Sequence, residues 1–187
     1  MATILQLRIL GAIFLLVAAT CTLLAMGRAT IGLLVAMLAA FLIWAREPSR
    51  RIPPGHGLVV TYALAWGVMC LHCAEEYLTG FPQQFPRWFG YEWKNSAFLT
   101  FNLVWLLIFG AAAFGLARSV PLALLVAWFF ALGAGIVNGV GHLLLSLALN
   151  RYFPGLLTAP FCLGFGLLLA RQLSRCPILP PTRRGRK

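Results

Sequence analysis

Acidic residues are scarce in this chain, and charged residues of either sign are few. Of its 187 residues only four are Asp or Glu, charged side chains make up 10% of the sequence, and 61% of the residues are hydrophobic. A typical soluble domain has about 25% charged residues, so this composition excludes an ordinary soluble globular protein. Apolar stretches long enough to cross a bilayer recur along the chain, which predicts an all-α, polytopic transmembrane helical bundle.

Other absences narrow the class of protein further. The five cysteines lie in apolar segments and in the tail, without the spacing of a secreted disulfide framework. No stretch repeats at a fixed period. The net charge of +11 comes from basic residues that lie between apolar segments and in the tail, where they orient membrane helices. This placement favours membrane lipids as partners and excludes nucleic acid.

Glycine, proline and charged residues divide the chain into about six apolar segments. We expect them at 9–27, 29–45, 57–78, 96–117, 120–149 and 156–171, and most reach the ~20 residues that a transmembrane helix needs. We therefore predict two N-terminal helices and a loop (1–56), a four-helix core (57–171) and a basic tail (172–187). The first segment resembles a signal peptide, but Thr20 makes "VAATC" a poor lipobox, so we expect an uncleaved helix.

The distribution of basic residues predicts the orientation of the helices. With a cytoplasmic N-terminus, eleven Lys and Arg residues lie on the cytoplasmic side and four on the other, which accounts for all fifteen. Because the cytoplasmic loops of membrane proteins are enriched in Lys and Arg, both termini are expected to be cytoplasmic. The charge bias and the helix count are typical of a multi-pass protein of a cell membrane, and we expect the bacterial inner membrane.

The stretch "LHCAEEYLTG" (71–80) places a histidine and two adjacent carboxylates near the outer end of the third segment. At 100° per residue, His72, Glu75 and Glu76 share one face of that helix, within a wedge of ~100°. Ionisable side chains inside a membrane are costly, and they usually face the bundle interior, where they mark functional sites. Cys70 and Cys73 point away from this face, so we interpret them as packing residues despite their CxxC spacing.

Polar residues on other segments lie at the same depth. The fifth segment carries Asn138 and His142 one turn apart, and glycines 135 and 139 beside them allow close helix packing. Further polar residues fall in this outer layer on the fourth and sixth segments: Thr100, Asn102 and Thr158. We therefore predict one shared site in the outer leaflet, although Asn102 by itself is also typical of an ordinary interhelical hydrogen bond.

Three motifs together resemble one protein family. His72-x-x-Glu75-Glu76, Asn138-x-x-x-His142 and "YFPGLLTA" (152–159) are similar to the HXXEE-domain membrane proteins. The resemblance covers roughly residues 57–170 and leaves the first two helices outside it. That family has no established reaction. The resemblance therefore supports a site at these five positions and implies no particular chemistry.

A metal site is the first of three interpretations of these residues. Two imidazoles and a carboxylate suit one divalent ion, Zn²⁺ or Fe²⁺, and leave a coordination position open for water or substrate. The predicted ligands are His72, Glu75 and His142, with Glu76 as a hydrogen-bond partner or a general base. A carboxylate-bridged di-iron centre is disfavoured, because it needs glutamates from several helices.

The same residues suit two interpretations without metal. Adjacent carboxylates in a low dielectric repel each other, so one of them is expected to stay protonated and to act as an acid. With a histidine as base, it can isomerise, hydrate or hydrolyse a lipid-soluble molecule. In the third interpretation the buried residues bind a hydrophobic ligand, relay protons in a transporter or serve the structure alone. The candidate catalytic residues are Glu76, Glu75 and Asn138.

Overall fold

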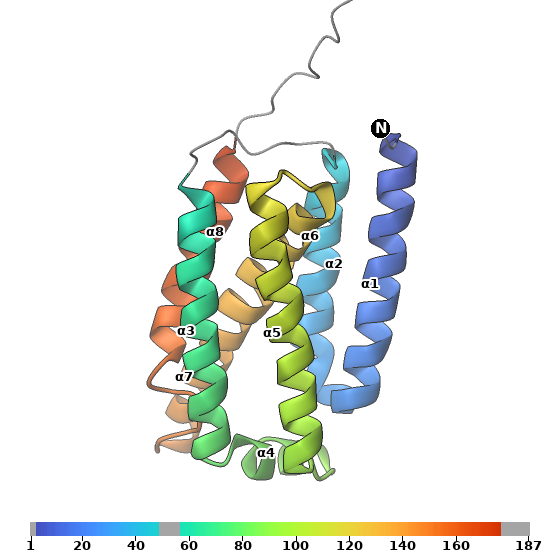
Figure 1. The fold of residues 1–187 in the computed structure, drawn as a ribbon. Coiled ribbons are helices and arrows are strands. Elements are labelled where there is room, and N and C mark those ends of the chain that lie inside the picture. The colour runs from blue at the N-terminus through green and yellow to red at the C-terminus, as the bar shows by residue number, and fades with distance from the viewer. Residues whose placement is uncertain (1–2, 49–56, 177–187) are drawn as a thin grey trace, which may run out of the picture.

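The computed structural model describes residues 3–48 and 57–176, which form helices and connecting turns without any strand (Figure 1). The longer helices are α1 (Ile4–Met26), α2 (Ile31–Arg46), α3 (Leu58–Leu78), α5 (Asn95–Ala117), α6 (Pro121–Phe129), α7 (Asn138–Leu149) and α8 (Ala159–Arg175). Within the described ranges, four stretches are long and apolar enough to cross a membrane: Ile4–Arg46, Leu58–Leu78, Asn95–Ala117 and Pro121–Leu149. The predicted all-α helical bundle is confirmed for the described residues, and the number of helices that cross a membrane stays a prediction.

The helices run alternately up and down, so that the connections gather at two ends of the bundle (Figure 1). The start of α1 and the end of α8 lie at the same end, and the cytoplasmic location of that end stays a prediction. The opposite end carries the turns around 26–31, 78–95 and 149–158, and we call it the site end. It includes the short helix α4 (Phe81–Gln84) and a 3₁₀ turn, Pro86–Phe89.

The local sequence explains where several helices begin and end. Thr3 starts α1 with a capping box, in which its hydroxyl accepts from the Gln6 N–H and the Gln6 side chain accepts from the Thr3 N–H. Pro121 occupies the first turn of α6, where a missing N–H leaves no hydrogen bond unmade. Asn150 ends α7 in the left-handed conformation, with φ of 49°, which asparagine tolerates better than most residues.

The helix at the centre of the bundle is continuous from α6 to α7 and contains a π-helical segment, Phe130–Val137. All residues from Ala123 to Ala131 are buried. α8 approaches this helix very closely, because a Cβ on Gly135 would lie 2.6 Å from the Gly166 Cα and one on Gly139 would lie 2.9 Å from the Ala159 carbonyl oxygen. The predicted role of glycines 135 and 139 in close helix packing is confirmed.

Several predicted boundaries need correction. The first helix begins at Ile4 instead of residue 9, and the last one begins at Ala159 instead of 156 and continues to Arg175 instead of 171. The late start of α8 has a physical reason, because Gly155 adopts a φ of +92° that interrupts helical geometry. Most of the predicted basic tail (177–187) and part of the loop of the first region (49–56) lie outside the described residues.

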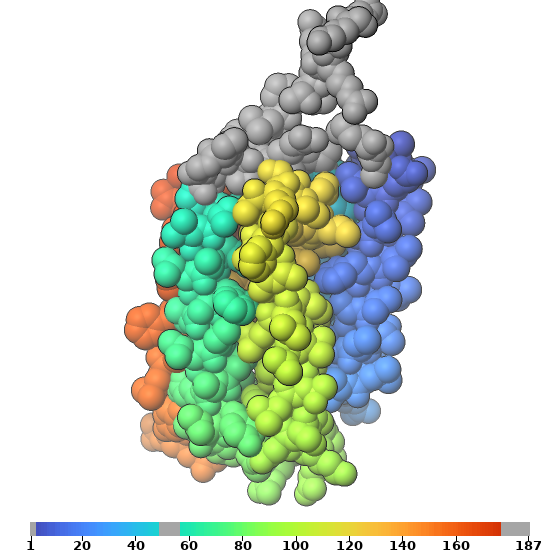
Figure 2. Space-filling view, in the orientation of Figure 1, coloured from blue at the N-terminus to red at the C-terminus, as the bar shows by residue number. Residues whose placement is uncertain are grey.

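One broad face of the molecule presents α3, α5 and α1 in that order (Figure 2). α3 packs against α5 and α8, and α1 packs mainly against α2. α1 therefore flanks the bundle, and its other long neighbour on this face is α5. The side chains of these two helices define a groove that is described below.

Candidate functional site

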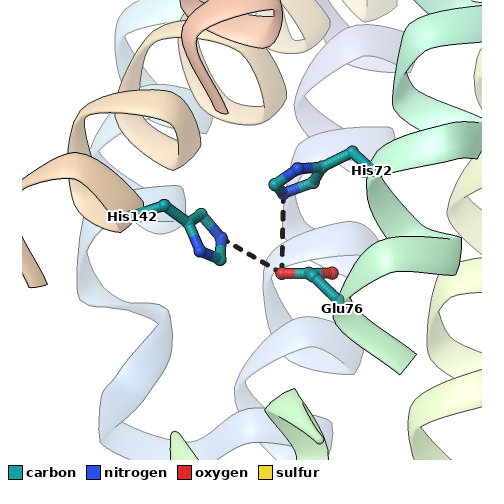
Figure 3. A group of neighbouring side chains, drawn as sticks. All are labelled: His72, Glu76 and His142. Atoms are coloured by element: carbon teal, nitrogen blue, oxygen red, sulfur yellow. Dashed lines mark ion pairs between the residues drawn. The ribbon is translucent and has the colours of Figure 1, made fainter. Parts of the chain in front are cut away.

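Three buried ionisable side chains meet between α3 and α7 near the site end: His72, Glu76 and His142 (Figure 3). We call them the His/Glu site. Glu76 Oε1 lies 3.1 Å from Nε2 of His142 and 3.6 Å from Nε2 of His72. The two imidazoles are nearly perpendicular, with centroids 4.7 Å apart. Because such groups are costly inside a membrane, their convergence indicates a functional site and confirms that residues of the two segments come together.

The ring of His142 is oriented by the turn that follows α7. Its Nδ1 lies 2.6 Å from the carbonyl oxygen of Pro154. A carbonyl oxygen only accepts hydrogen bonds, so Nδ1 of His142 carries the proton. In the neutral ring, Nε2 then keeps its lone pair, and this lone pair faces Glu76.

The ring of His72 is oriented in the same way by Thr158. Nδ1 of His72 lies 2.7 Å from the Thr158 Oγ1, and the hydroxyl proton of Thr158 is donated to Glu75 Oε2 at 2.5 Å. The hydroxyl oxygen is therefore the acceptor for Nδ1–H, and Nε2 of His72 carries the lone pair. Asn138 Nδ2 donates to this Nε2 over 2.7 Å. The Nε2 atoms of both histidines thus lie near the same oxygen of Glu76, 3.1 Å away for His142 and 3.6 Å away for His72.

The structure corrects the predicted ligand set, because Glu75 does not lie with the histidines. Its carboxylate accepts hydrogen bonds from the Tyr152 hydroxyl at 2.7 Å, the Leu157 N–H at 2.8 Å, and the N–H and hydroxyl of Thr158 at 2.9 and 2.5 Å. The Leu157 and Thr158 donors lie directly at the N-terminal end of α8, where a helix dipole favours a negative charge. Successive helix residues point 100° apart, so Glu76 reaches α7 while Glu75 reaches the loop.

Residues 150–158, which we call the site loop, are held to α3 mainly through this carboxylate. Burial, followed by the hydrogen bond to Glu75, raises the pKa of the Tyr152 hydroxyl. Tyr152 therefore remains a protonated donor to Glu75 at neutral pH. Of the site-loop residues, the sequence pattern singled out Thr158 by its depth, and the structure places its hydroxyl between Glu75 and His72.

Replacing Thr158 by valine is expected to change the protonation pattern of His72. The valine keeps the volume but removes the acceptor for Nδ1–H, which costs about 1–3 kcal/mol for a buried group left without a partner. Thermal unfolding in detergent measures the loss, and ¹⁵N NMR of the imidazoles reports the tautomer. Thr158→Ser retains the hydroxyl and is expected to match the wild type in the NMR measurement. An unchanged His72 tautomer in Thr158→Val would contradict the assignment.

Gly155 brings the site loop against both imidazoles. Its φ of +92° belongs to the region that favours glycine. A Cβ at this position would lie 2.6 Å from Cε1 and Nδ1 of His142 and 2.9 Å from Cε1 of His72. Sequence reasoning missed the contacts of Pro154 and Gly155, although a Pro-Gly pair marks a turn and both residues belong to the quoted "YFPGLLTA" motif.

A cavity of about 90 Å³ adjoins the His/Glu site between α3, α5 and the central helix. Its walls are mostly aromatic and aliphatic, and besides His72 and Glu76 its polar members are Cys73, Asn102 and Asn138. Cys73, which we interpreted as a packing residue, packs against the hydrophobic core and also lines this cavity. Its thiol donates to Asn102 Oδ1 over 3.3 Å. Asn102 thus makes the interhelical hydrogen bond that its sequence position suggested.

Aromatic side chains cover the two histidines at the site end. The ring centroid of Phe81, in α4, lies 5.4 Å from that of His142, and Phe153 of the site loop lies 5.8 Å from it. Both phenylalanines are buried and belong to a cluster with Met26, Trp93 and Phe98. This cluster separates the His/Glu site from the connecting turns at that end. Thr100, which was predicted in the same polar layer, faces a different space, between α1 and α5.

Comparison with known proteins identifies one matching family. The family model described as "Protein of unknown function with HXXEE motif" matches residues 63–169. The match spans the helices that carry His72, Glu76 and His142, together with the site loop. No match was found among curated proteins, and none among solved structures.

Proposed function

The chain belongs to the family of proteins of unknown function with an HXXEE motif, and we propose that it is a metal-dependent membrane enzyme. One divalent ion is held by His72, Glu76 and His142, and the substrate is a lipid-soluble molecule. The observation that carries this proposal is the convergence of two imidazole Nε2 atoms on one carboxylate oxygen. The proposed ligand set differs from the sequence prediction only in its carboxylate, which is now Glu76.

The spacing of the three ligand atoms supports a single ion. In a tetrahedral site with ligands about 2.0–2.1 Å from the metal, the ligand atoms lie about 3.3 Å from one another. The distances from Glu76 Oε1 to the two Nε2 atoms are 3.1 and 3.6 Å, and all three ligand atoms lie within 4.8 Å of one another. Small side-chain movements suffice to bring them to one ion. Three protein ligands leave a position open, as in catalytic sites.

The hydrogen bonds made by the Nδ1 atoms of the two histidines support the same function. Histidines that bind metals almost always donate their other ring N–H to a carbonyl, a carboxylate or another oxygen acceptor. Here Pro154 and Thr158 provide those acceptors, and Glu75 in turn holds Thr158. Two histidines and one glutamate suit catalytic Zn²⁺ and also the Fe²⁺ of two-histidine, one-carboxylate sites.

The chain's own residues can then bind and orient a substrate beside the ion. A bound divalent ion would polarise a substrate oxygen or lower the pKa of a bound water. Asn138 and Cys73 line the cavity next to the His/Glu site and can position a polar group of the substrate by hydrogen bonding. The surrounding aromatic and aliphatic walls favour an apolar molecule and exclude water from the remaining space.

A second candidate function is acid–base catalysis without metal. It is favoured by one observation, the hydrogen bond from Asn138 Nδ2 that occupies the Nε2 lone pair of His72. In this case Glu76 and His142 share a proton across their 3.1 Å contact and act as an acid and base pair. The two candidates differ in a measurable property, which is the metal content of the protein.

Elemental analysis of the purified protein tests the proposal. We expect about one zinc or iron ion per chain, and loss of that ion in His142→Ala, because a ligand is removed. Thr100→Ala is the matched control: it removes a polar side chain on α5 that lies outside the cavity, and it is expected to retain the ion. Absence of metal from the wild type, even after incubation with Zn²⁺ or Fe²⁺, would rule out the metal function and leave acid–base catalysis.

A further inference from the structure

A second, larger space lies on the membrane-facing side of α5. The α1–α5 groove has a volume of about 640 Å³, within the roughly 300–1,000 Å³ range of small-molecule sites. Its walls are formed by Phe14, Val17, Ala18, Cys21, Thr22 and Ala25 of α1 and by Ser96, Ala97, Thr100, Phe101, Val104, Trp105 and Ile108 of α5. Most of these side chains are apolar. In Figure 2 the two helices that form it lie next to each other on one face of the molecule.

The groove and the cavity at the His/Glu site share part of their walls. Phe101 and Trp105 line both spaces, and both are only partly buried. The ring of Trp105 packs on Phe129 of the central helix, with centroids 5.0 Å apart, and that of Phe101 lies 5.6 Å from Trp93. Side chains of α5, instead of a layer of further helices, therefore separate the groove from the cavity. Rotation of these two side chains would connect them.

The α1 wall of the groove carries a polar group without a partner. The side chain of Thr22 is 1% exposed, and its Oγ1 has no hydrogen-bond partner among the described residues. A buried hydroxyl left unpaired destabilises the protein. Because Thr22 lines the groove, rotation of its side chain would offer this hydroxyl to a bound ligand. The hydroxyl or carbonyl of an otherwise apolar molecule would provide that bond.

We propose that the α1–α5 groove is the lateral access route and chain-binding site for the substrate of the His/Glu site. The substrate is a molecule with a hydroxyl or carbonyl head and a linear hydrocarbon chain. It enters from the bilayer between α1 and α5, and its head passes Thr22 and then Phe101 and Trp105 to reach the cavity. The chain remains in the groove. This inference rests on the proposed function, because it assigns the substrate class of that same site.

The aromatic cover at the site end supports a route from the side. Phe81, Phe153 and their neighbours are packed between the histidines and the connecting turns, so an approach from that end requires unpacking of a buried cluster. An approach along the groove requires only movement of partly buried side chains of α5. The groove lies between two apolar helices. A long-chain substrate dissolves in the bilayer, so it would approach the groove from there.

Photolabelling with a diazirine-bearing long-chain fatty alcohol in phosphatidylcholine vesicles tests this inference. We expect saturable labels on the α1 and α5 residues of the groove, and competition by the unlabelled alcohol. Val104→Trp fills the groove and should weaken this labelling by about tenfold or more. Leu103→Trp is the matched control on the lipid-exposed surface of α5, outside the groove and the cavity, and should label like the wild type.

Labelling spread over the lipid-facing residues of all helices, without saturation or competition, would overturn the lateral route. Equal labelling of Val104→Trp and the wild type would overturn it as well. The wild-type competition measurement does not depend on the folding of either variant. Metal content, measured on the same samples, reports separately on the proposed function. A metal-loaded protein without groove labelling contradicts the access route alone, and groove labelling without metal contradicts the metal function alone.

Discussion

Glu76→Gln is expected to abolish metal binding, whereas Glu75→Gln, one residue earlier, is expected to leave the ion in place. Glu76 Oε1 is the atom that lies near both Nε2 atoms. The amide of glutamine is neutral and a poor ligand, so the affinity for Zn²⁺ or Fe²⁺ should fall by about 100-fold or more, beyond the 10–100-fold typical of residues that only support a ligand. The two variants are isosteric with the wild type and differ only in which carboxylate is removed.

Glu75→Gln is expected to act on stability instead. Its carboxylate accepts four hydrogen bonds from the site loop, and an amide in its place turns an NH₂ group toward the Thr158 N–H. Because hydrogen bonds to a charged group contribute about 1.5–3 kcal/mol each, a loss of about 2–4 kcal/mol in the free energy of unfolding is expected. The metal affinity should change by about tenfold at most, through the weakened support of Thr158.

Competition with a chelator measures the metal affinity of both variants, and chemical unfolding in detergent measures their stability. The two variants are expected to change different quantities. Glu76→Gln lowers the metal affinity, and Glu75→Gln lowers the free energy of unfolding. Retention of the ion by Glu76→Gln together with its loss in Glu75→Gln would restore the ligand set predicted from the sequence. It would contradict the arrangement in Figure 3.

Gly155→Ala is expected to lower both the stability and the metal affinity of the protein, although Gly155 is not a proposed metal ligand. The added Cβ would lie 2.6 Å from two atoms of the His142 ring, and the backbone at φ of +92° is strained for any other residue. Strain of about 1–3 kcal/mol and overpacking of about 1–3 kcal/mol together predict a loss of about 3 kcal/mol or more in stability. The displaced imidazole should also lower the metal affinity by about 10–100-fold, as for lost support of a ligand.

Gly164→Ala provides the control for this variant. Gly164 lies within α8 at an exposed position, and a Cβ there would meet no atom within 4 Å. Alanine is favoured over glycine in a helix by about 1 kcal/mol, so this variant should be at least as stable as the wild type. Thermal unfolding and chelator competition on both variants check the prediction. A Gly155→Ala protein with wild-type stability and affinity would show that the site loop does not pack on the histidines as described.

The depth of the site was predictable because depth follows directly from position along a helix. His72 and His142 each lie near the site end of an apolar segment, and counting residues from the segment ends is sufficient to place them level. Thr158 was placed at that level by the same argument, and its hydroxyl indeed contacts His72. The close packing at Gly135 was predictable as well, since small residues at helical spacing are typical of close helix contacts.

The choice between the two carboxylates was not predictable from helical periodicity. Glu75 and Glu76 lie three and four residues after His72, and both spacings place a side chain next to it on the helix surface. Which of them belongs to the site depends on what packs against each side of α3. α7 brings His142 to Glu76, while the start of α8 brings a row of donors to Glu75.

The sequence by itself determined an all-α bundle with helices long and apolar enough to span a membrane, and it determined the level of the polar residues, because hydrophobicity and depth are properties of each segment taken alone. The tertiary structure decided which side chains share a site, how the site loop orients both imidazoles, and that a groove between α1 and α5 adjoins the cavity. These features depend on the rotation of each helix about its axis and on the path of a turn with positive φ at Gly155. Both are set by packing between segments far apart in the chain, which no local pattern encodes.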